Sequence, residues 1–213
     1  MLVLSMETGM LSQLVLQKIG IVCGFVVPIV AFGCIGIAIV SYPEFSWVNN
    51  ALSDLGVVSG VTALAFNLGL FIAGLLGFFF AIIGLFSYFK NNLVGKVGSI
   101  VFAVATVWLM AIGIFNENFH PTHFIVSVLF FITLPVALWV LTVALYLKNE
   151  VKLALFTLIS SFIAAAPWIL FYAVHYVQNV AIPETISALT GSIWIIIMSY
   201  KILKTAKTLP IDT

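Results

Sequence analysis

Charged residues are scarce in this sequence, and arginine is absent from it altogether. Asp, Glu and Lys together make up 7% of the 213 residues, and the net charge is +1. Soluble domains carry about a quarter charged residues, so a chain this poor in charge cannot present a surface to water over most of its area. It also has no basic cluster that could neutralise nucleic-acid phosphates. The composition therefore predicts an integral membrane protein and no nucleic-acid partner.

Cysteines and recognisable catalytic motifs are scarce as well. The two cysteines, Cys23 and Cys34, fall in one apolar run. On a single helix they would lie about 16 Å apart, which is too far for a disulfide, so we interpret them as small apolar packing residues. The sequence holds no Gly-x-Ser-x-Gly elbow, phosphate-binding loop or His-x-x-x-His pair. No reaction-specific signature is present.

What the sequence does have is long apolar runs. Apolar residues make up 63% of the chain, and the mean hydropathy is +1.27. A helix needs about 20 such residues to cross a bilayer, and continuous runs without polar/apolar alternation exclude a membrane barrel. We predict an all-α, six-helix transmembrane bundle forming one domain over residues 1–213, with spans at about 18–40, 63–89, 96–115, 123–147, 151–177 and 184–203. Gly20 and Gly24 form a small-xxx-small pair that predicts close helix packing in the first span.

The lysines indicate how these spans are oriented. In a six-span chain, all eight lysines fall before the first span, in the second and fourth connections, or after the last span. Because lysines mark the cytoplasmic side, both termini are predicted to lie inside the cell membrane. The opposite connections carry acids and no lysine: Glu44, Asp54, Glu117 and Glu184. The polar site is therefore expected to face outside.

The first outer connection, residues 41–62, is the densest polar stretch and is predicted to cap the bundle. Residues 47–54 read as one or two turns of interfacial helix that Gly56 ends. Asn49/Ser53 and Asn50/Asp54 would then be stacked i,i+4 pairs. Asn67, about one turn into the second span, should bond to a partner in residues 50–54, because a bare amide in lipid is costly. The polar candidates for binding a ligand or holding the cap are Glu44, Asn49, Asn50, Ser53, Asn67 and Glu117.

The three histidines also belong to the outer half. His120 and His123 follow Glu117 in the third connection, and His175 lies near the outer end of the fifth span. Imidazoles and carboxylates suit zinc, so zinc is a possible cofactor with His120, His123 and His175 as its ligands. They also suit acid–base chemistry, with Asp54 or His123 as general base. The alternative interpretation is that these residues are solvated loop and capping groups.

Two motifs resemble a known family. They are Pro43 with Asn-Ala-Leu-Ser-Asp-Leu-Gly56, and Phe115, Glu117, His120 and His123 leading to Ser127 and Phe130-Phe131. Over nearly its whole length the chain is similar to an uncharacterised prokaryotic multi-pass membrane family, catalogued as domain of unknown function nine-nine-eight. That resemblance implies a membrane bundle and no particular activity, substrate or cofactor.

Two shorter stretches have looser resemblances. Ser53-Asp54-x-Gly56 resembles the eukaryotic six-span family involved in lipid-anchor remodelling and autophagy. Glu44 and Asn49 are placed as in the metal-dependent membrane hydrolases that include alkaline ceramidases and adiponectin receptors. Those hydrolases have seven spans and a late His-x-x-x-His, and this chain has neither.

Two functions from different classes remain open. The first is a non-enzymatic membrane protein, either a subunit of a larger complex or a bundle that binds lipid or a small ligand. The second is a lipid-active hydrolase or transferase at the outer leaflet, in which His120, His175 and Glu117 would serve as ligands or acid partners. We expect membrane lipid as a partner and other membrane subunits as further candidates. A transporter is the third choice, because no charged residue falls at the middle of a span.

Overall fold

The computed structural model describes the backbone of residues 2–207 and the side chains of residues 15–206, and in this part of the chain there is helix and no strand. Six helical segments are long and apolar enough to cross a membrane. The ends of the four inner segments, residues 61–88, 93–114, 122–147 and 151–174, lie within about three residues of the predicted bounds. The predicted all-α bundle is confirmed, and the chain is a multi-pass integral membrane protein.

Most of the spans are single helices, and the second is composite. Its parts are α2 (Val61–Phe79), a π-helical turn η2 (Phe80–Leu85) and α3 (Phe86–Tyr88), which run on from one another without a break. The other spans are α1 (Leu2–Val40), α4 (Leu93–Ile114), α5 (Thr122–Leu147), α6 (Val151–Val174) and α7 (Ala181–Lys207).

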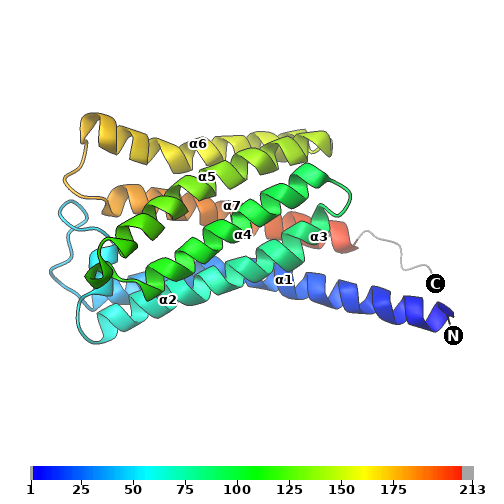
Figure 1. Cartoon of the computed structure of the whole chain (residues 1–213), viewed down its shortest axis with the longest axis horizontal. Coiled ribbons are helices and arrows are strands. Elements are labelled where there is room, and N and C mark those ends of the chain that lie inside the picture. The colour runs from blue at the N-terminus through cyan, green and yellow to red at the C-terminus, as the bar shows by residue number, and fades with distance from the viewer. Residues whose placement is uncertain (1, 208–213) are drawn as a thin grey trace.

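The helices pack as a closed ring in chain order (Figure 1). α1 packs on α2, α2 on α4, α4 on α5, α5 on α6 and α6 on α7, and α7 returns to contact α1. Short connections place consecutive helices side by side, as in other antiparallel bundles. The α1–α7 contact closes the ring, so the first and last spans enclose the same interior.

Glycines permit the closest helix approach in this ring. A Cβ added to Gly20 would lie 2.5 Å from the backbone nitrogen of Gly84, in the π-helical turn. One added to Gly24 would collide with the Ser199 hydroxyl and the Phe80 ring. The predicted close contact at Gly20 and Gly24 is therefore confirmed: α1 approaches the second span at the first glycine and α7 at the second.

Two tryptophans of the bundle bond to hydroxyls on the neighbouring helix. The indole of Trp194, fully buried on α7, donates to the Thr157 hydroxyl of α6 at 3.0 Å. The indole of Trp168 on α6 donates to the Ser187 hydroxyl of α7, also at 3.0 Å. Such bonds hold helices together where lipid offers no hydrogen-bonding partner.

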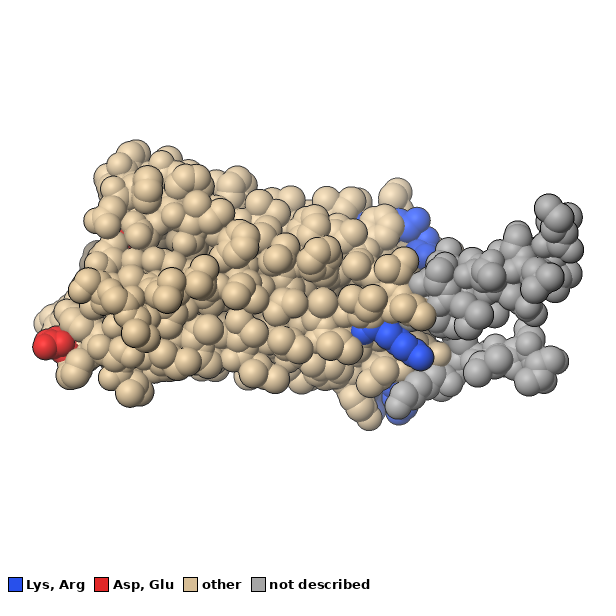
Figure 2. Space-filling view, turned by 90° about the horizontal axis from the view of Figure 1, so that it is seen from below, with Lys and Arg blue, Asp and Glu red and all other residues tan. Residues whose placement is uncertain are grey.

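The two ends of the bundle differ in charge. We call the end formed by residues 41–60, 115–121 and 175–180 the cap end, and the opposite one, with residues 89–92 and 148–150, the lysine end. Figure 2 shows lysines at the end nearest both termini, an uncharged middle and acidic side chains at the far end. At the lysine end, Lys201 pairs with Glu150, and the Lys148 ammonium donates to the Tyr88 carbonyl at 3.0 Å.

The cap contains a shorter helix than predicted. A 3-10 helix, η1 (Ser53–Gly56), replaces the expected interfacial helix over residues 47–54, which was wrong in its bounds. Asp54 takes one backbone donor that a helix would need, since its Oδ2 accepts from Ala51 N at 3.1 Å, whereas Asn50 N still bonds to the Ser46 carbonyl at 2.9 Å, as in a single helical turn. Asn and Asp compete with the backbone in this way and favour turns over helix.

Candidate functional site

Asp54 organises the cap. Its Oδ2 accepts hydrogen bonds from the Asn50 amide at 2.6 Å and from Ala51 N at 3.1 Å. The predicted Asn50/Asp54 pair is therefore present. The Asn49/Ser53 pair is not, because Asn49 is exposed and the Ser53 hydroxyl donates elsewhere, to Glu117. The main chain of the cap also bonds to the segment that enters α7: Asn179 N donates to Val48 O at 3.0 Å.

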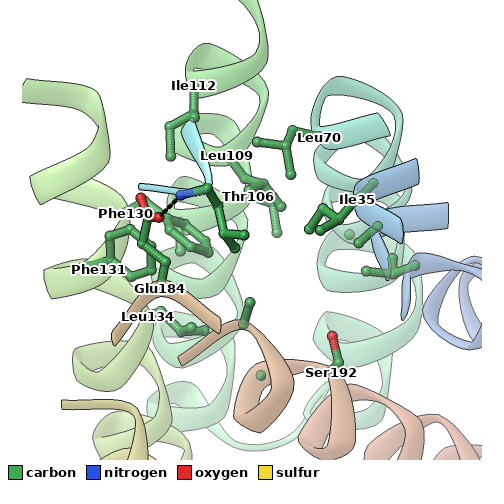
Figure 3. A pocket seen from close by; sticks show the side chains of 18 of the residues that line it. Ile35, Leu70, Thr106, Leu109, Ile112, Phe130, Phe131, Leu134, Glu184 and Ser192 are labelled. Atoms are coloured by element: carbon green, nitrogen blue, oxygen red, sulfur yellow. Dashed lines mark hydrogen bonds between the residues drawn. The ribbon is translucent and has the colours of Figure 1, made fainter. Parts of the chain in front are cut away.

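Glu184 of α7 (Ala181–Lys207) is hydrogen-bonded to the cap. It lies in the first turn of α7, is 8% exposed, and accepts a hydrogen bond from Leu52 N at 2.6 Å through Oε2. Figure 3 shows this carboxyl reaching from α7 toward the amide. From the sequence, Glu184 was counted among the acids of the outer connections and was left out of the candidate site residues. The available signal was a carboxyl at the edge of an otherwise apolar run.

Glu117 brings a third carboxyl to the same place. It lies in a single 3-10 turn, η3 (Glu117–Phe119), and its Oε1 accepts from the Ser53 hydroxyl at 2.7 Å. Burial raises the pKa of Glu117, and the charge of the neighbouring Asp54 raises it further, whereas the Ser53 bond and His123 act against this.

His123 lies beside the carboxyls with its tautomer determined by its contacts. Its Nδ1 is 2.7 Å from the Phe115 carbonyl oxygen, which can only accept, so Nδ1 carries the proton. Nε2 then remains an acceptor, 3.5 Å from the Ser127 hydroxyl. His123 is 8% exposed, and it lines a cavity at the cap end. An imidazole whose Nδ1 donates to a carbonyl can accept a proton at Nε2.

The other two histidines are placed differently. His120 is exposed, precedes a cis peptide bond to Pro121, and lines the same cavity as His123. His175 ends α6 in a left-handed backbone conformation, and its ring packs on Phe171 of the preceding turn, so it does not line that cavity. Within the described side chains, no group of three His, Cys, Asp or Glu residues is arranged to hold a metal ion. The three histidines expected to bind zinc do not converge.

Asn67 and Asn116 hold the end of the cap helix. The Asn67 amide donates to the Gly56 carbonyl at 2.9 Å, and the Asn116 amide donates to the same oxygen at 3.3 Å. The expected bond from Asn67 to the cap therefore exists, two residues beyond the segment predicted. The Asn67 Oδ1 is buried without a hydrogen-bond partner. Glu44 and Asn49 are exposed on the cap and do not line the cavity.

We call the space at the cap end the cap cavity; its volume is about 550 Å³. Most of the polar groups that line it come from the cap, η3 and the start of α7, and we call this part its polar end. Most of the apolar and aromatic side chains that line it come from α5 and α6. Three of these, Phe124, Ile132 and Tyr172, are more than half exposed, so the cavity is open to the surface beside α5 and α6. The residues that line it are Ala51, Ser53, Asp54, Glu117, His120, His123, Phe124, Ser127, Val128, Phe131, Ile132, Trp168, Tyr172, Asn179, Val180 and Glu184.

A second space, the bundle cavity, lies deeper between the helices and has a volume of about 110 Å³. Its walls are almost entirely apolar, with Leu70 and Ile35 on one side and Phe130 and Leu134 on the other (Figure 3). The residues that line both cavities are Ser53, Ser127, Phe131 and Glu184. Glu184 and its bond to Leu52 therefore stand at the boundary between a polar space and an apolar one.

The family comparison covers all of these residues. A family described as Protein of unknown function (DUF998) matches residues 25–201. The chain belongs to this family. The matched DUF998 region runs from the middle of α1 into α7 and includes the cap and both cavities, which confirms the resemblance seen in the two motifs. No curated protein and no solved structure gave a significant match.

Proposed function

We propose that this DUF998 protein binds an amphiphilic molecule, a lipid or a lipid-like compound, in the cap cavity. The observation that carries the proposal is the make-up of this cavity. Polar groups from the cap, η3 and α7 line its polar end, and apolar side chains of α5 and α6 line the part that is open to the surface. Ligand sites are typically apolar clefts with a few convergent polar groups, and this one suits a molecule with a polar head and an apolar chain.

The proposal includes an orientation. The described lysines lie at the lysine end, so by the positive-inside rule that end faces the cytoplasm and the cap end faces outward across the cell membrane. The ligand would then enter from the outer leaflet.

Photo-crosslinking tests this function. The purified protein is incubated with a neutral dodecyl alcohol that carries a diazirine next to the hydroxyl, and the labelled residues are mapped by mass spectrometry. We expect labelling of the residues at the polar end of the cap cavity, next to the hydroxyl, and we expect excess unlabelled dodecanol to suppress it with saturation. Uniform, non-saturable labelling of the lipid-facing surface would contradict a binding site.

A pair of α5 variants sharpens the result. Val128→Trp fills the cap cavity, whereas Ile125→Trp adds the same ring to an exposed position on α5 that does not line it. Labelling should fall in the first variant and persist in the second. Equal labelling in the two would place the ligand outside the cavity.

A second function rests on a different observation, the grouping of the carboxyls of Asp54 and Glu117 with the imidazole of His123. Such a group could act as general base and acid on a lipid bond at the outer leaflet, without a metal. Release of product from a dodecanoyl ester of a chromogenic alcohol, abolished in both Asp54→Asn and His123→Gln, would support it. Turnover that survives either substitution counts against it.

A further inference from the structure

The polar end of the cap cavity is unusual in its charge. It contains three carboxyls, from Asp54, Glu117 and Glu184, contributed by the cap, by η3 and by α7. No lysine is among the residues that line it, and the groups there that could pair with an anion are the imidazoles of His120 and His123. Three carboxyls outnumber these two imidazoles, so the charge of the cavity favours a cationic headgroup over an anionic one.

The hydrogen bonds at this end leave acceptors in excess. The donors that reach the three carboxyls from the protein are the Asn50 amide, the Ser53 hydroxyl and the backbone amides of Ala51 and Leu52. Each carboxylate oxygen has two acceptor positions, so three carboxylates have several more than these donors fill. A ligand that supplies N–H donors and positive charge would satisfy the remainder.

Glu184 is the strongest indication of such a ligand. It is more than nine-tenths buried, and within the described residues its single hydrogen bond comes from Leu52 N and reaches Oε2. Its other oxygen, Oε1, has no partner in this part of the chain, while the residue lines both cavities. A buried carboxylate is costly unless it is paired or fully hydrogen-bonded, so a donor placed in the cavity stabilises it.

The aromatic residues of the cavity fit the same ligand. The rings of Phe131 and Trp168 are in contact, tilted by 41° with centroids 4.4 Å apart, and they line the cavity together with Phe124 and Tyr172. Aromatic faces attract ammonium groups as well as packing against an alkyl chain. The carboxyls are not arranged as metal ligands, but an ammonium group makes less exact geometric demands because its donors rotate.

We propose that the ligand of the cap cavity is an amphiphile with a protonated amine headgroup, which Glu184 Oε1 and the carboxyls of Asp54 and Glu117 bind directly. This inference rests on the proposed function and specifies its ligand class. A primary ammonium supplies three N–H donors and a quaternary one supplies none. Because hydrogen-bond acceptors remain unfilled in the cavity, we expect a primary amine to bind more tightly than a trimethylammonium group. Both should bind more tightly than a neutral or anionic headgroup.

Competition against the photoreactive dodecyl alcohol tests the ranking. Four competitors share the dodecyl chain and differ in their headgroup: dodecylammonium, dodecyltrimethylammonium, dodecanol and dodecyl phosphate. A short-chain phosphatidylethanolamine is added to test whether the site accepts an amine that is next to a phosphate. We expect dodecylammonium to displace the label at a concentration at least about tenfold lower than dodecanol, because a charge-assisted bond in a buried site is being added. Dodecyl phosphate should compete worst.

Two variants test the role of the carboxyls. Glu184→Gln keeps an acceptor for Leu52 N but removes the charge, and the preference for dodecylammonium over dodecanol should fall to within about threefold. Glu117→Gln keeps the acceptor for Ser53 and should also reduce the preference, and it serves if the first variant does not fold. Glu44→Gln removes an exposed acid of the cap that does not line the cavity, and the preference should stay unchanged.

The outcomes separate the two proposals. Equal displacement by the ammonium and the alcohol, or tighter displacement by the phosphate, overturns the amine inference and leaves amphiphile binding standing. A preference that persists in both Glu184→Gln and Glu117→Gln also overturns it, since the charge then acts from elsewhere. If no competitor suppresses the label, both proposals fail.

Discussion

Glu184 Oε2 and the backbone amide of Leu52 lie 2.6 Å apart although 132 residues separate them in the chain. The bond ties the cap, which follows the first span, to the first turn of the last span. The first and last spans, α1 and α7, are in contact with each other, and this hydrogen bond joins the segments next to them at the cap end. One buried carboxyl thus links the architecture of the bundle to its candidate site.

Removing this carboxyl should loosen the cap. In Glu184→Leu the amide of Leu52, a residue only 5% exposed, loses its acceptor, and an orphaned buried donor costs about 1–3 kcal/mol. We expect a lower unfolding free energy in detergent micelles and faster hydrogen exchange at residues 50–56. Glu44→Leu, on the exposed side of the cap, should change stability by less than about 0.5 kcal/mol. Unchanged exchange at Leu52 in the first variant would contradict the bond.

Gly56 should not tolerate a side chain. A Cβ there would lie 2.6 Å from Asn67 Oδ1 and 3.2 Å from the Phe66 ring, so Gly56→Ala has to displace the amide that holds the cap. We expect a loss of about 1–3 kcal/mol, as for other overpacked sites, measured by thermal unfolding in detergent. Gly36→Ala is the matched control, because nothing lies within 4 Å of its added Cβ and alanine favours a helix. It should be neutral or stabilising.

Glu117 makes stability depend on pH. Burial raises the pKa of Glu117 in the folded protein above its ordinary value of 4.5, so the folded state holds this proton more tightly than the unfolded state does. The contribution to stability is full below pH 4.5, is lost as pH rises through the raised folded pKa, and is constant above it.

Glu117→Gln removes this contribution but keeps an acceptor for Ser53. Stability of the variant should therefore fall less than that of the parent protein as pH is raised from 4.5. Asp54, His123 and Glu184 face Glu117 in both proteins, so their titration remains in the comparison. Unfolding in detergent at a series of pH values measures the difference. Parallel curves for the two proteins would show that Glu117 titrates normally.

The orientation can be tested with a cysteine at each end of the bundle. Glu44→Cys and Asn91→Cys are exposed at the cap end and the lysine end, whereas Cys23 and Cys34 lie within the first span. A membrane-impermeant maleimide should label Glu44→Cys in intact cells and Asn91→Cys only after permeabilisation, with the unsubstituted protein as background. The reverse pattern would place the cap cavity in the cytoplasm.

The sequence determined the spans because a bilayer sets the required length of each apolar run locally. Residues 122–147, for example, are delimited by a polar connection at one end and Lys148 at the other, and nothing distant is needed to locate them. The positions of Asp54, Glu117 and His123 near one another were also predictable, since alternate connections of an antiparallel bundle meet at one end. The family followed from motifs that are continuous in the chain.

The tertiary structure decided which of these polar groups meet. His175 shares an end with His120 and His123, but the left-handed residue that stops α6 places its ring on Phe171, and no local pattern indicates that direction. Glu184 entered the site because ring closure brings α7 against the cap. The predicted cap helix gave way to turns because Asp54 took the backbone donor of Ala51. Hydropathy acts locally along a chain, whereas convergence of side chains depends on how separate helices pack, and so the chemistry of the cap cavity was decided by the fold.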